Sequence, residues 1–212
     1  MKKYFSTIVL LSAALTCSQP AGAAGKGSFS LPRPYKQNNA ALKTAIFAGG
    51  CFWCMEPPFE KLDGVKAVIS GYAGGKEKNP TYDDVSYGRT TQVESVLVLY
   101  DPKIIGYEKL LEVFWRNINP EQADGQFYDV GPQYMTYIFY GNEAERAAAE
   151  KSKADLLKSG KFSRIATGIR PATEFWPAED YHQDYYKKNP AHYYRYRTGS
   201  GRDAYIQSKW GK

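Results

Sequence analysis

Cysteine and histidine are scarce in this sequence: its 212 residues include three cysteines and two histidines. A zinc site built on Cys51 and Cys54 would need His182 and His192 as its remaining ligands. Both histidines lie far along the chain, without the spacing of a zinc finger. We therefore expect them to be hydrogen-bonding residues of the core or surface, and we expect no metal ion.

Long apolar runs are missing after the N-terminus, and dense runs of lysine and arginine are missing throughout. The first absence excludes a membrane-spanning helix from most of the chain. The second removes the usual signal of nucleic-acid binding, although the formal net charge is +6. Internal repeats and low-complexity segments are absent too. The length is sufficient for one domain with a sizeable core.

Residues 1–23 have the form of a secretory signal peptide. Lys2 and Lys3 precede a short apolar stretch at 8–15, and the small residues at 21–23 fit a cleavage site. The apolar stretch is too short to span a bilayer. We expect an exported, periplasmic and soluble mature protein.

The third cysteine, Cys17, lies inside this segment. It offers a lipoprotein route, which is disfavoured because Thr16 stands where a small residue is wanted. Cleavage would leave Cys51 and Cys54, and in an exported protein the simplest interpretation of two cysteines is one structural disulfide. A structural disulfide stabilises most when it closes a long loop. This pair would close almost none, so the spacing argues against a purely structural bridge.

The rest of the pattern predicts a polar N-terminal arm at 24–43 and one domain at 44–212. Strands are expected at 45–48, 65–72, 93–100, 135–140 and 165–175. Helices are expected at 51–64, 107–118 and 142–160, and loops at 76–92 and 119–134.

Two local features refine these elements. Pro57 and Pro58 should cap or distort the first helix, because proline lacks the N–H that a helix interior needs. Asn142 with Glu145 forms a capping arrangement for the alanine-rich helix. The tail from Tyr181 onward is expected to be irregular. Interspersed strands and helices favour an α+β two-layer sandwich, a mixed sheet packed by helices with a ferredoxin-like core.

The stretch GGCFWC at 49–54 carries the chemistry. A cysteine where a strand turns into a helix meets free N–H groups and the positive end of the helix dipole, and both favour a thiolate. Cys51 is placed for this effect, and Gly49 and Gly50 allow the turn before it. Cys54 lies one helical turn further on the same face, within reach of a disulfide.

Phe52 and Trp53 stand between the two thiols and offer apolar walls beside a nucleophile. Either ring alone is equally well explained as a core aromatic. By itself the C-x-x-C pattern is compatible with thioredoxin-like redox chemistry or half of a zinc site.

Seven motifs occur in order along the chain. They are GGCFWCMEPPFEKLDGV, SGYAGG, PTYDDVSYGRT, VESVLVLYDP, LLEVFWRNINP, GQFYDVGPQY and FWPAEDYHQDY. Together they resemble the A-type peptide methionine sulfoxide reductases, in the branch with a cysteine in place of the final glycine of GCFWG. The resemblance runs from about residue 44 to about residue 197 and marks 44–212 as the catalytic domain.

The resemblance implies that Cys51 attacks the sulfoxide sulfur and becomes a sulfenic acid as methionine leaves. A sulfoxide oxygen must be protonated to leave, so an acid is needed opposite the thiolate. Glu94 matches the acid of the family, and a semi-apolar pocket should raise its pKa. The alternative is a glutamate exposed on a strand. The alternation of residues along 93–100 does not decide between a catalytic acid and an exposed glutamate.

The other site residues also follow from the resemblance. Tyr82 and Tyr134 match tyrosines that hydrogen-bond the sulfoxide oxygen. Phe52 and Trp53 would form the pocket for the ε-methyl group and select the S epimer. Asp129 matches an acid that organises the site. Without the resemblance, each tyrosine reads as a packing residue and Asp129 as a turn cap.

Cys54 is the remaining candidate for the resolving cysteine, because the C-terminal tail, where many relatives carry one, has none. The implied cycle runs from a Cys51 sulfenic acid through a Cys51–Cys54 disulfide to reduction by a thioredoxin-type protein. Substrates would be oxidised proteins or free methionine sulfoxide. No metal or organic cofactor is implied, and we expect a monomer.

The chain departs from the family in two places. Thr91 and Gln92 stand where Gly-His is common, and Met135 and Thr136 where Arg-Ser is common; these bear on substrate range and rate. Two other functions are open. A thioredoxin-like thiol–disulfide oxidoreductase would share the C-x-x-C but leave Glu94 without a role. A binding module for glycans or peptides would use the basic, aromatic surface.

Overall fold

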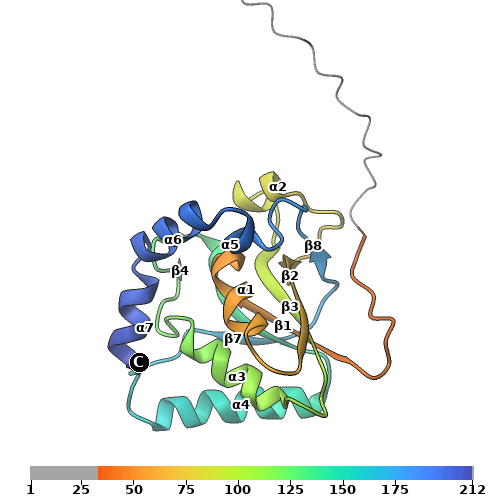
Figure 1. Ribbon diagram of the computed structural model, residues 1–212. Helices are drawn as coiled ribbons and strands as arrows, with labels where there is room; N and C mark the ends of the chain where they lie inside the picture. Colours follow the sequence, from red (N-terminus) through yellow and green to blue (C-terminus); the bar gives the residue numbers. More distant parts are fainter. Residues whose placement is uncertain (1–32, 212) are drawn as a thin grey trace, which may run out of the picture. The chain divides into compact units, whose positions relative to one another are not determined.

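The computed structural model describes residues 33–211 (Figure 1). The predicted signal peptide, with Cys17, lies outside the described residues. The strands are β1 (Lys43–Gly49), β2 (Val65–Ala73), β3 (Val93–Tyr100), β4 (Gly125–Gln126), β5 (Asp129–Val130), β6 (Thr136–Tyr140), β7 (Gly168–Pro171) and β8 (Trp176–Pro177). The helices are α1 (Phe52–Glu60), α2 (Tyr82–Ser86), α3 (Tyr107–Arg116), η1 (Pro132–Tyr134), α4 (Glu143–Lys158), α5 (Tyr185–Lys188), α6 (Pro190–Gly199) and α7 (Arg202–Trp210).

The main sheet has six strands in the order β7-β6-β1-β3-β2-β8. The four central strands are antiparallel neighbours, and β7 joins β6 in parallel, so the sheet is mixed. Helix α1 links β1 to β2 and α3 precedes β6, so each crossover skips one strand. This split β-α-β arrangement is the predicted ferredoxin-like core.

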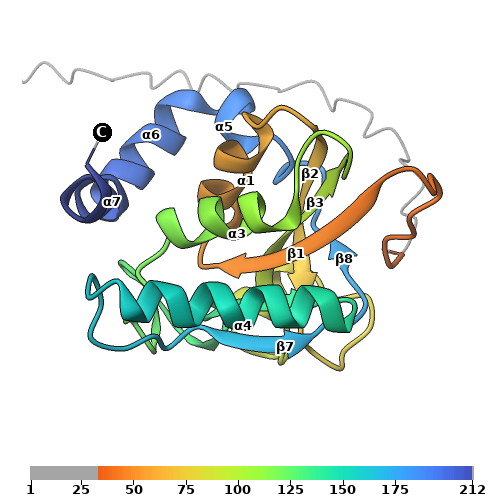
Figure 2. The same ribbon diagram turned by 90° about the horizontal axis from the view of Figure 1, so that it is seen from below.

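Helices α1, α3 and α4 pack on one face of the sheet, with α3 and α4 side by side (Figure 2). Phe47 of β1 lies at the centre of this layer. Its ring stacks at 5.2 Å on Phe59 of α1 and at 5.3 Å on Phe114 of α3. The opposite face carries a smaller apolar cluster that includes Phe175, whose carbonyl accepts a 2.8 Å hydrogen bond from the Tyr35 N–H.

Several elements form where the sequence predicts them. Strand β3 has the predicted bounds, and the Asn142 side chain caps α4 by accepting a 3.0 Å hydrogen bond from the Glu145 N–H. The predicted loop at 76–92 instead contains the short helix α2. Thr81 and Asp84 form a capping box at its start, which stabilises a helix too short to show periodicity.

Pro57 and Pro58 do not cap helix α1, because the helix continues through both. A regular helix would pair the Cys54 carbonyl with the N–H of residue 58, which proline lacks. The Arg197 side chain takes that place: its Nη1 donates to the Cys54 carbonyl at 3.0 Å. A contact from the C-terminal region thus replaces the missing backbone bond.

The expectation of an irregular C-terminal tail is wrong, since helices α5, α6 and α7 occupy most of it. The predicted strand at 165–175 is also mostly irregular and holds only β7. The tail helices show no apolar periodicity because their buried residues are tyrosine and arginine. Tyr193 and Arg202 are both buried.

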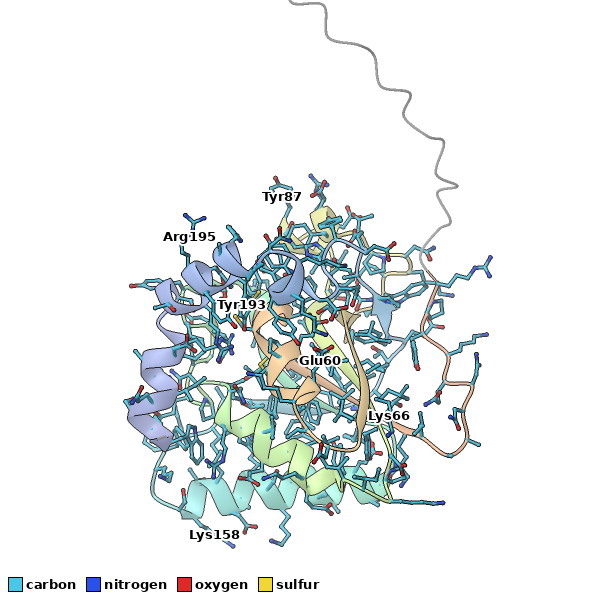
Figure 3. The ribbon with its side chains drawn as sticks, viewed as in Figure 1. Glu60, Lys66, Tyr87, Lys158, Tyr193 and Arg195 are labelled. Atoms are coloured by element: carbon cyan, nitrogen blue, oxygen red, sulfur yellow. The ribbon has the colours of Figure 1, made fainter. Side chains whose placement is uncertain are left out.

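A carboxyl on α1 holds the start of this tail. Glu56 is buried, and its Oε1 accepts a 3.0 Å hydrogen bond from the N–H of Asp184, a residue in the left-handed conformation. Burial raises the pKa of Glu56 to about 7. Glu60, on the last turn of α1, accepts a hydrogen bond from the Tyr186 hydroxyl, and the Tyr186 ring packs on Tyr193 of α6. Glu60 and Tyr193 are labelled in Figure 3.

Over residues 33–211, every helix is too short or too polar to traverse a lipid bilayer.

We expect Phe47→Ala to lower the free energy of unfolding by about 3–5 kcal/mol, because it empties the centre of the helix-covered core. Urea unfolding followed by circular dichroism measures this. Ile104→Ala is the matched control, since Ile104 is 58% exposed, and it should cost under about 0.5 kcal/mol. Equal losses in the two variants would contradict this assignment of the core.

Candidate active site

Cys51 lies where β1 ends and α1 begins, and it is the N-cap residue of α1. Gly50 before it has φ +77°, a conformation that favours glycine. A Cβ at this glycine would also come within 2.5 Å of the Gln126 Cβ. Backbone conformation and close packing together require the glycine at this turn.

Cys51 and Cys54 are both free, buried thiols. Burial raises the pKa of the Cys51 thiol well above its usual value. The hydrogen bond from Cys51 lowers the pKa of Cys54 to about 7, and the positive charges of Arg202 and Arg197 act in the same direction. The direction of the Cys51 shift is opposite to the one expected from the helix start, because desolvation disfavours the charged form of the thiol.

Glu94 faces the turn from the neighbouring strand β3. It is 2% exposed, and its Oε2 accepts a 3.0 Å hydrogen bond from the Phe52 N–H, the residue after Cys51. Burial raises the pKa of Glu94 to about 8. The carboxyl is therefore mostly protonated at neutral pH and can donate a proton. The alternative of an exposed strand glutamate is wrong.

Two tyrosines complete the polar side of the site. Tyr82 begins α2, with its N–H donating to Glu179 at 2.8 Å, and Tyr134 ends the short helix η1. Burial raises the pKa of Tyr82 to about 12 and also raises that of Tyr134, and the charges of Glu94 and Cys51 contribute to both. Both hydroxyls are protonated at neutral pH and can donate hydrogen bonds.

Phe52 and Trp53 differ in environment. Phe52 is 1% exposed and belongs to the core cluster, with its ring 5.0 Å from that of His182. Trp53 is only partly buried. Its indole stacks on Tyr185 at 3.8 Å and donates from Nε1 to His182 Nδ1 at 3.1 Å. The tail region thus fixes the orientation of the more open aromatic ring.

His182 is held in its neutral form. Burial lowers its pKa to about 4, which leaves Nδ1 free to accept the Trp53 N–H. The second histidine, His192, is hydrogen-bonded to the Tyr185 hydroxyl at 3.0 Å. Both histidines are hydrogen-bonding residues, as the sequence predicts.

Asp129 approaches the thiols from the β4–β5 hairpin. Its carboxylate accepts a hydrogen bond from the Tyr196 hydroxyl of α6. Burial raises its pKa, and the positive charge of Arg202 opposes that rise. This carboxyl links the hairpin to the C-terminal helices, which goes beyond capping a turn.

One group of acids among residues 33–211 has spacing suited to a metal ion. Oxygens of Glu56, Glu60 and Asp184 lie within 4.8 Å of one another. The Lys187 ammonium already contacts two of them, at 2.8 Å from Glu60 and 2.6 Å from Asp184. The cysteines are not part of this group.

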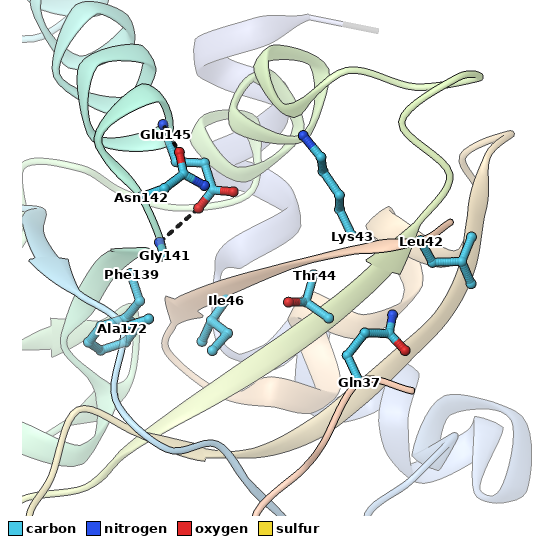
Figure 4. Close-up of a pocket in the computed structure, with 10 residues that line it drawn as sticks. All are labelled: Gln37, Leu42, Lys43, Thr44, Ile46, Phe139, Gly141, Asn142, Glu145 and Ala172. Atoms are coloured by element: carbon cyan, nitrogen blue, oxygen red, sulfur yellow. Dashed lines mark hydrogen bonds between the residues drawn. The ribbon is translucent and has the colours of Figure 1, made fainter. Parts of the chain in front are cut away.

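A cavity of about 290 Å³ lies away from the thiols, between the start of β1 and the start of α4 (Figure 4). Lys43, Phe139 and Glu145 are among its lining residues, and the Glu145 carboxylate accepts a 2.8 Å hydrogen bond from the Gly141 N–H. Its lining includes no residue predicted for catalysis.

The structure adds residues that the sequence did not single out. Glu179, His182 and Tyr185 lie in the FWPAEDYHQDY motif, so the presence of that motif could have indicated them as site residues. Tyr196 and Arg202 lie outside the seven motifs and carried no signal. The contacts given above bring Glu94, Phe52 and Trp53 to the Cys51 turn, and the charges of Cys51 and Glu94 influence the pKa of both Tyr82 and Tyr134. A buried thiol pair beside a neutral carboxyl and two phenols can carry out thiol chemistry on a substrate that needs a proton.

Comparison with known proteins identifies the family of this chain. The pattern of the family described as PMSR, peptide methionine sulfoxide reductase, matches residues 43–212. A relative from Halalkalibacterium halodurans, named peptide methionine sulfoxide reductase MsrA, is 53% identical over 172 residues, which are 81% of this chain and 98% of the relative.

Two solved structures of a yeast protein are also similar. Mxr1 from Saccharomyces cerevisiae in reduced form has a TM-score of 0.68 at 34% identity, covering 73% of this chain and 90% of that chain. Mxr1 in complex with Trx2 has a TM-score of 0.50 at 25% identity, covering 69% and 87%. Sequence and fold therefore agree that the chain belongs to the peptide methionine sulfoxide reductase family, oxidoreductases that act on methionine sulfoxide.

Proposed function

We propose that this protein reduces the S epimer of methionine sulfoxide, in oxidised proteins or free, to methionine. The observation that carries the proposal is the buried, protonated Glu94 carboxyl bonded to the N–H next to Cys51. A thiol–disulfide exchange enzyme needs no such acid, whereas a sulfoxide oxygen leaves only after protonation.

In the first step the Cys51 sulfur attacks the sulfoxide sulfur, and the oxygen is transferred to Cys51. Glu94 donates a proton to that oxygen, and the proton lost by the Cys51 thiol restores the acid. The products are methionine and a Cys51 sulfenic acid, so the substrate sulfur is reduced and the Cys51 sulfur is oxidised by two electrons.

We assign to Tyr82 and Tyr134 the role of donating hydrogen bonds to the sulfoxide oxygen. Their raised pKa values keep both hydroxyls protonated, so each can donate a hydrogen bond as negative charge develops on that oxygen. Trp53 and Phe52 are assigned to the ε-methyl group. The stack on Tyr185 holds the indole in place, and a fixed apolar wall opposite two donors can distinguish epimers.

In the second step the Cys54 thiolate attacks the Cys51 sulfenic acid, giving a disulfide and water. A thioredoxin-type protein then reduces the disulfide. The lowered pKa of Cys54 supports its attack on the sulfenic acid. Mxr1, whose fold is similar to that of this chain, has been solved in complex with Trx2, and this supports reduction by a thioredoxin-type protein.

We propose further that residues 44–212 act as one monomeric catalytic domain exported to the periplasm. The signal-like segment at 1–23 supports export. Export would place the enzyme where oxidised methionine in periplasmic proteins needs repair.

Cys51→Ser should abolish methionine release, and Glu94→Gln should slow it by about 10²–10⁴-fold, because an amide cannot donate a proton as an acid does. The assay supplies separated S and R epimers of a blocked methionine sulfoxide with dithiothreitol. Gln37→Ala, a change remote from the site, is the control and should behave as the unmodified protein. Turnover of the R epimer, or full activity of Glu94→Gln, would refute the proposal.

Single-turnover methionine release should decline as the pH rises past about 8, because the Glu94 carboxyl, with a pKa raised to about 8, loses the proton it must donate. Quenched-flow measurements over a pH series test this. The alkaline decline should disappear in Glu94→Gln, which keeps only its low residual rate. Persistence of the same decline in that variant would assign it to another group.

Cys54→Ser should still release one equivalent of methionine but lose most turnover with thioredoxin, by at least about tenfold, because no disulfide can form. The sulfenic acid should accumulate and be trapped by dimedone. Undiminished turnover with thioredoxin would show that the reductant attacks the Cys51 sulfenic acid directly.

A further inference from the structure

Arg202, at the start of α7, is a buried cation without an ion-pair partner. It is 1% exposed, and within the described part of the chain no carboxylate lies within ion-pair distance of it. Its Nε has no hydrogen-bond partner there either. A buried charge of this kind is costly unless an anion compensates it. The arrangement therefore needs a reason.

The guanidinium lies against the turn that carries both thiols. Nη2 donates to the Gly49 carbonyl at 3.0 Å, and Nη1 approaches the Met55 sulfur at 3.6 Å. A Cβ added at Gly50 would stand 3.1 Å from Nη2. The charge thus contacts residues on both sides of the Cys51–Cys54 segment.

A second arginine approaches the same segment, but its charge is paired. Arg197 Nη1 donates to the Cys54 carbonyl at 3.0 Å, while its Nε pairs with Asp203 at 2.7 Å. Arg202 is held instead by neutral groups: Nη1 also donates to the Asn117 carbonyl at 2.5 Å, and the guanidinium lies 4.6 Å from the centre of the Phe127 ring. Its charge is therefore less fully compensated than that of Arg197.

We propose that Arg202 is a positioning residue for the second half of the reaction, in which its guanidinium charge stabilises the attacking thiolate of Cys54. This inference rests on the proposed function. The step is balanced as follows: the Cys54 thiolate bonds to the Cys51 sulfur, the S–O bond breaks, and the leaving hydroxide takes up a proton to become water. The Cys54 sulfur is oxidised as the Cys51 sulfur is reduced.

The guanidinium matters most after the first step. In the free protein, the hydrogen bond from Cys51 contributes most to lowering the pKa of Cys54, and Arg202 adds to it. Oxidation of Cys51 replaces its S–H group by the hydroxyl of the sulfenic acid, which must leave in this step. That oxidation does not change the charge of Arg202, which favours a Cys54 thiolate more than Arg197 does.

Several other titratable or charged groups face Cys54 from the elements around it. They are Cys51 on α1, Glu94 on β3, Asp129 on β5, and Tyr193, Tyr196 and Arg197 on α6. Arg202→Lys keeps the positive charge that acts on these groups, so the comparison of Arg202→Gln with Arg202→Lys, made in the same background, tests the charge at position 202.

The test compares Arg202→Gln with Arg202→Lys, which keeps the charge. Reduced protein receives the blocked S-sulfoxide without reductant, and quenched flow follows methionine release and disulfide formation separately. For each unit by which the pKa of Cys54 rises, Arg202→Gln should form the disulfide about threefold more slowly at acidic pH. The thiolate fraction falls about tenfold, while nucleophilicity rises about threefold. At alkaline pH the same variant should be as fast or faster, so the two pH profiles cross.

A direct titration supplements the kinetics. In a Cys17→Ser, Cys51→Ser background, ultraviolet thiolate absorbance reports Cys54 alone. Its midpoint should rise in Arg202→Gln and stay in place in Arg202→Lys. An unchanged midpoint in Arg202→Gln, or an equal rise in both variants, would overturn the proposal. A uniform slowing at every pH would do the same, since that indicates a structural role.

Circular dichroism checks that Arg202→Gln is folded. If it is not, Arg202→Lys and Asp203→Asn, a change at a partly exposed residue, decide. Asp203→Asn removes the partner of Arg197 and should lower the midpoint, while Arg202→Lys should leave it unchanged; the opposite pair of results would overturn the proposal. Failure of the proposed function is distinguishable, because it would remove the methionine burst from the unmodified protein itself.

Discussion

The hydrogen bond between the Glu94 carboxyl and the Phe52 N–H is the contact on which the site depends. It joins a central strand to the first residue of α1, so the acid and Cys51 keep one relative position. The same burial that allows this bond also keeps the carboxyl protonated. Packing of the sheet against the helix layer therefore sets both the geometry and the charge state of the acid.

The C-terminal region holds several side chains of the site in place. His182 and Tyr185 fix the Trp53 indole, Tyr196 bonds to Asp129, and Arg202 bonds to the strand end before Cys51. None of these contacts involves a neighbour in sequence. Loss of the tail would remove the side chains that hold the Trp53 indole and the positive charge beside the thiols.

The sequence predicts the central sheet well because its signals are local. Strand β3 is a valine-rich run ended by Asp-Pro, and the Asn142 cap lies within one turn of its partner. The tail helices could not be predicted, because their buried residues, such as Tyr193 and Arg202, look polar in sequence and depend on contacts with α1. The eight site residues came from motif resemblance, whereas alternation left Glu94 undecided. The raised pKa of Cys51 could not be predicted from the sequence, because desolvation by burial is a tertiary effect.

Burial limits the reactivity of the two thiols in different ways. A thiolate, not a thiol, reacts with oxidants. Burial keeps Cys51 protonated in the free protein, and Cys54, the more acidic thiol, is 1% exposed. The nucleophile is thus unreactive at rest, and the reactive thiolate has little access to solvent. Under the proposed function, a bound sulfoxide would bring an acceptor for the Cys51 sulfur next to the Glu94 proton, so we infer that substrate binding, and not the helix dipole alone, activates Cys51.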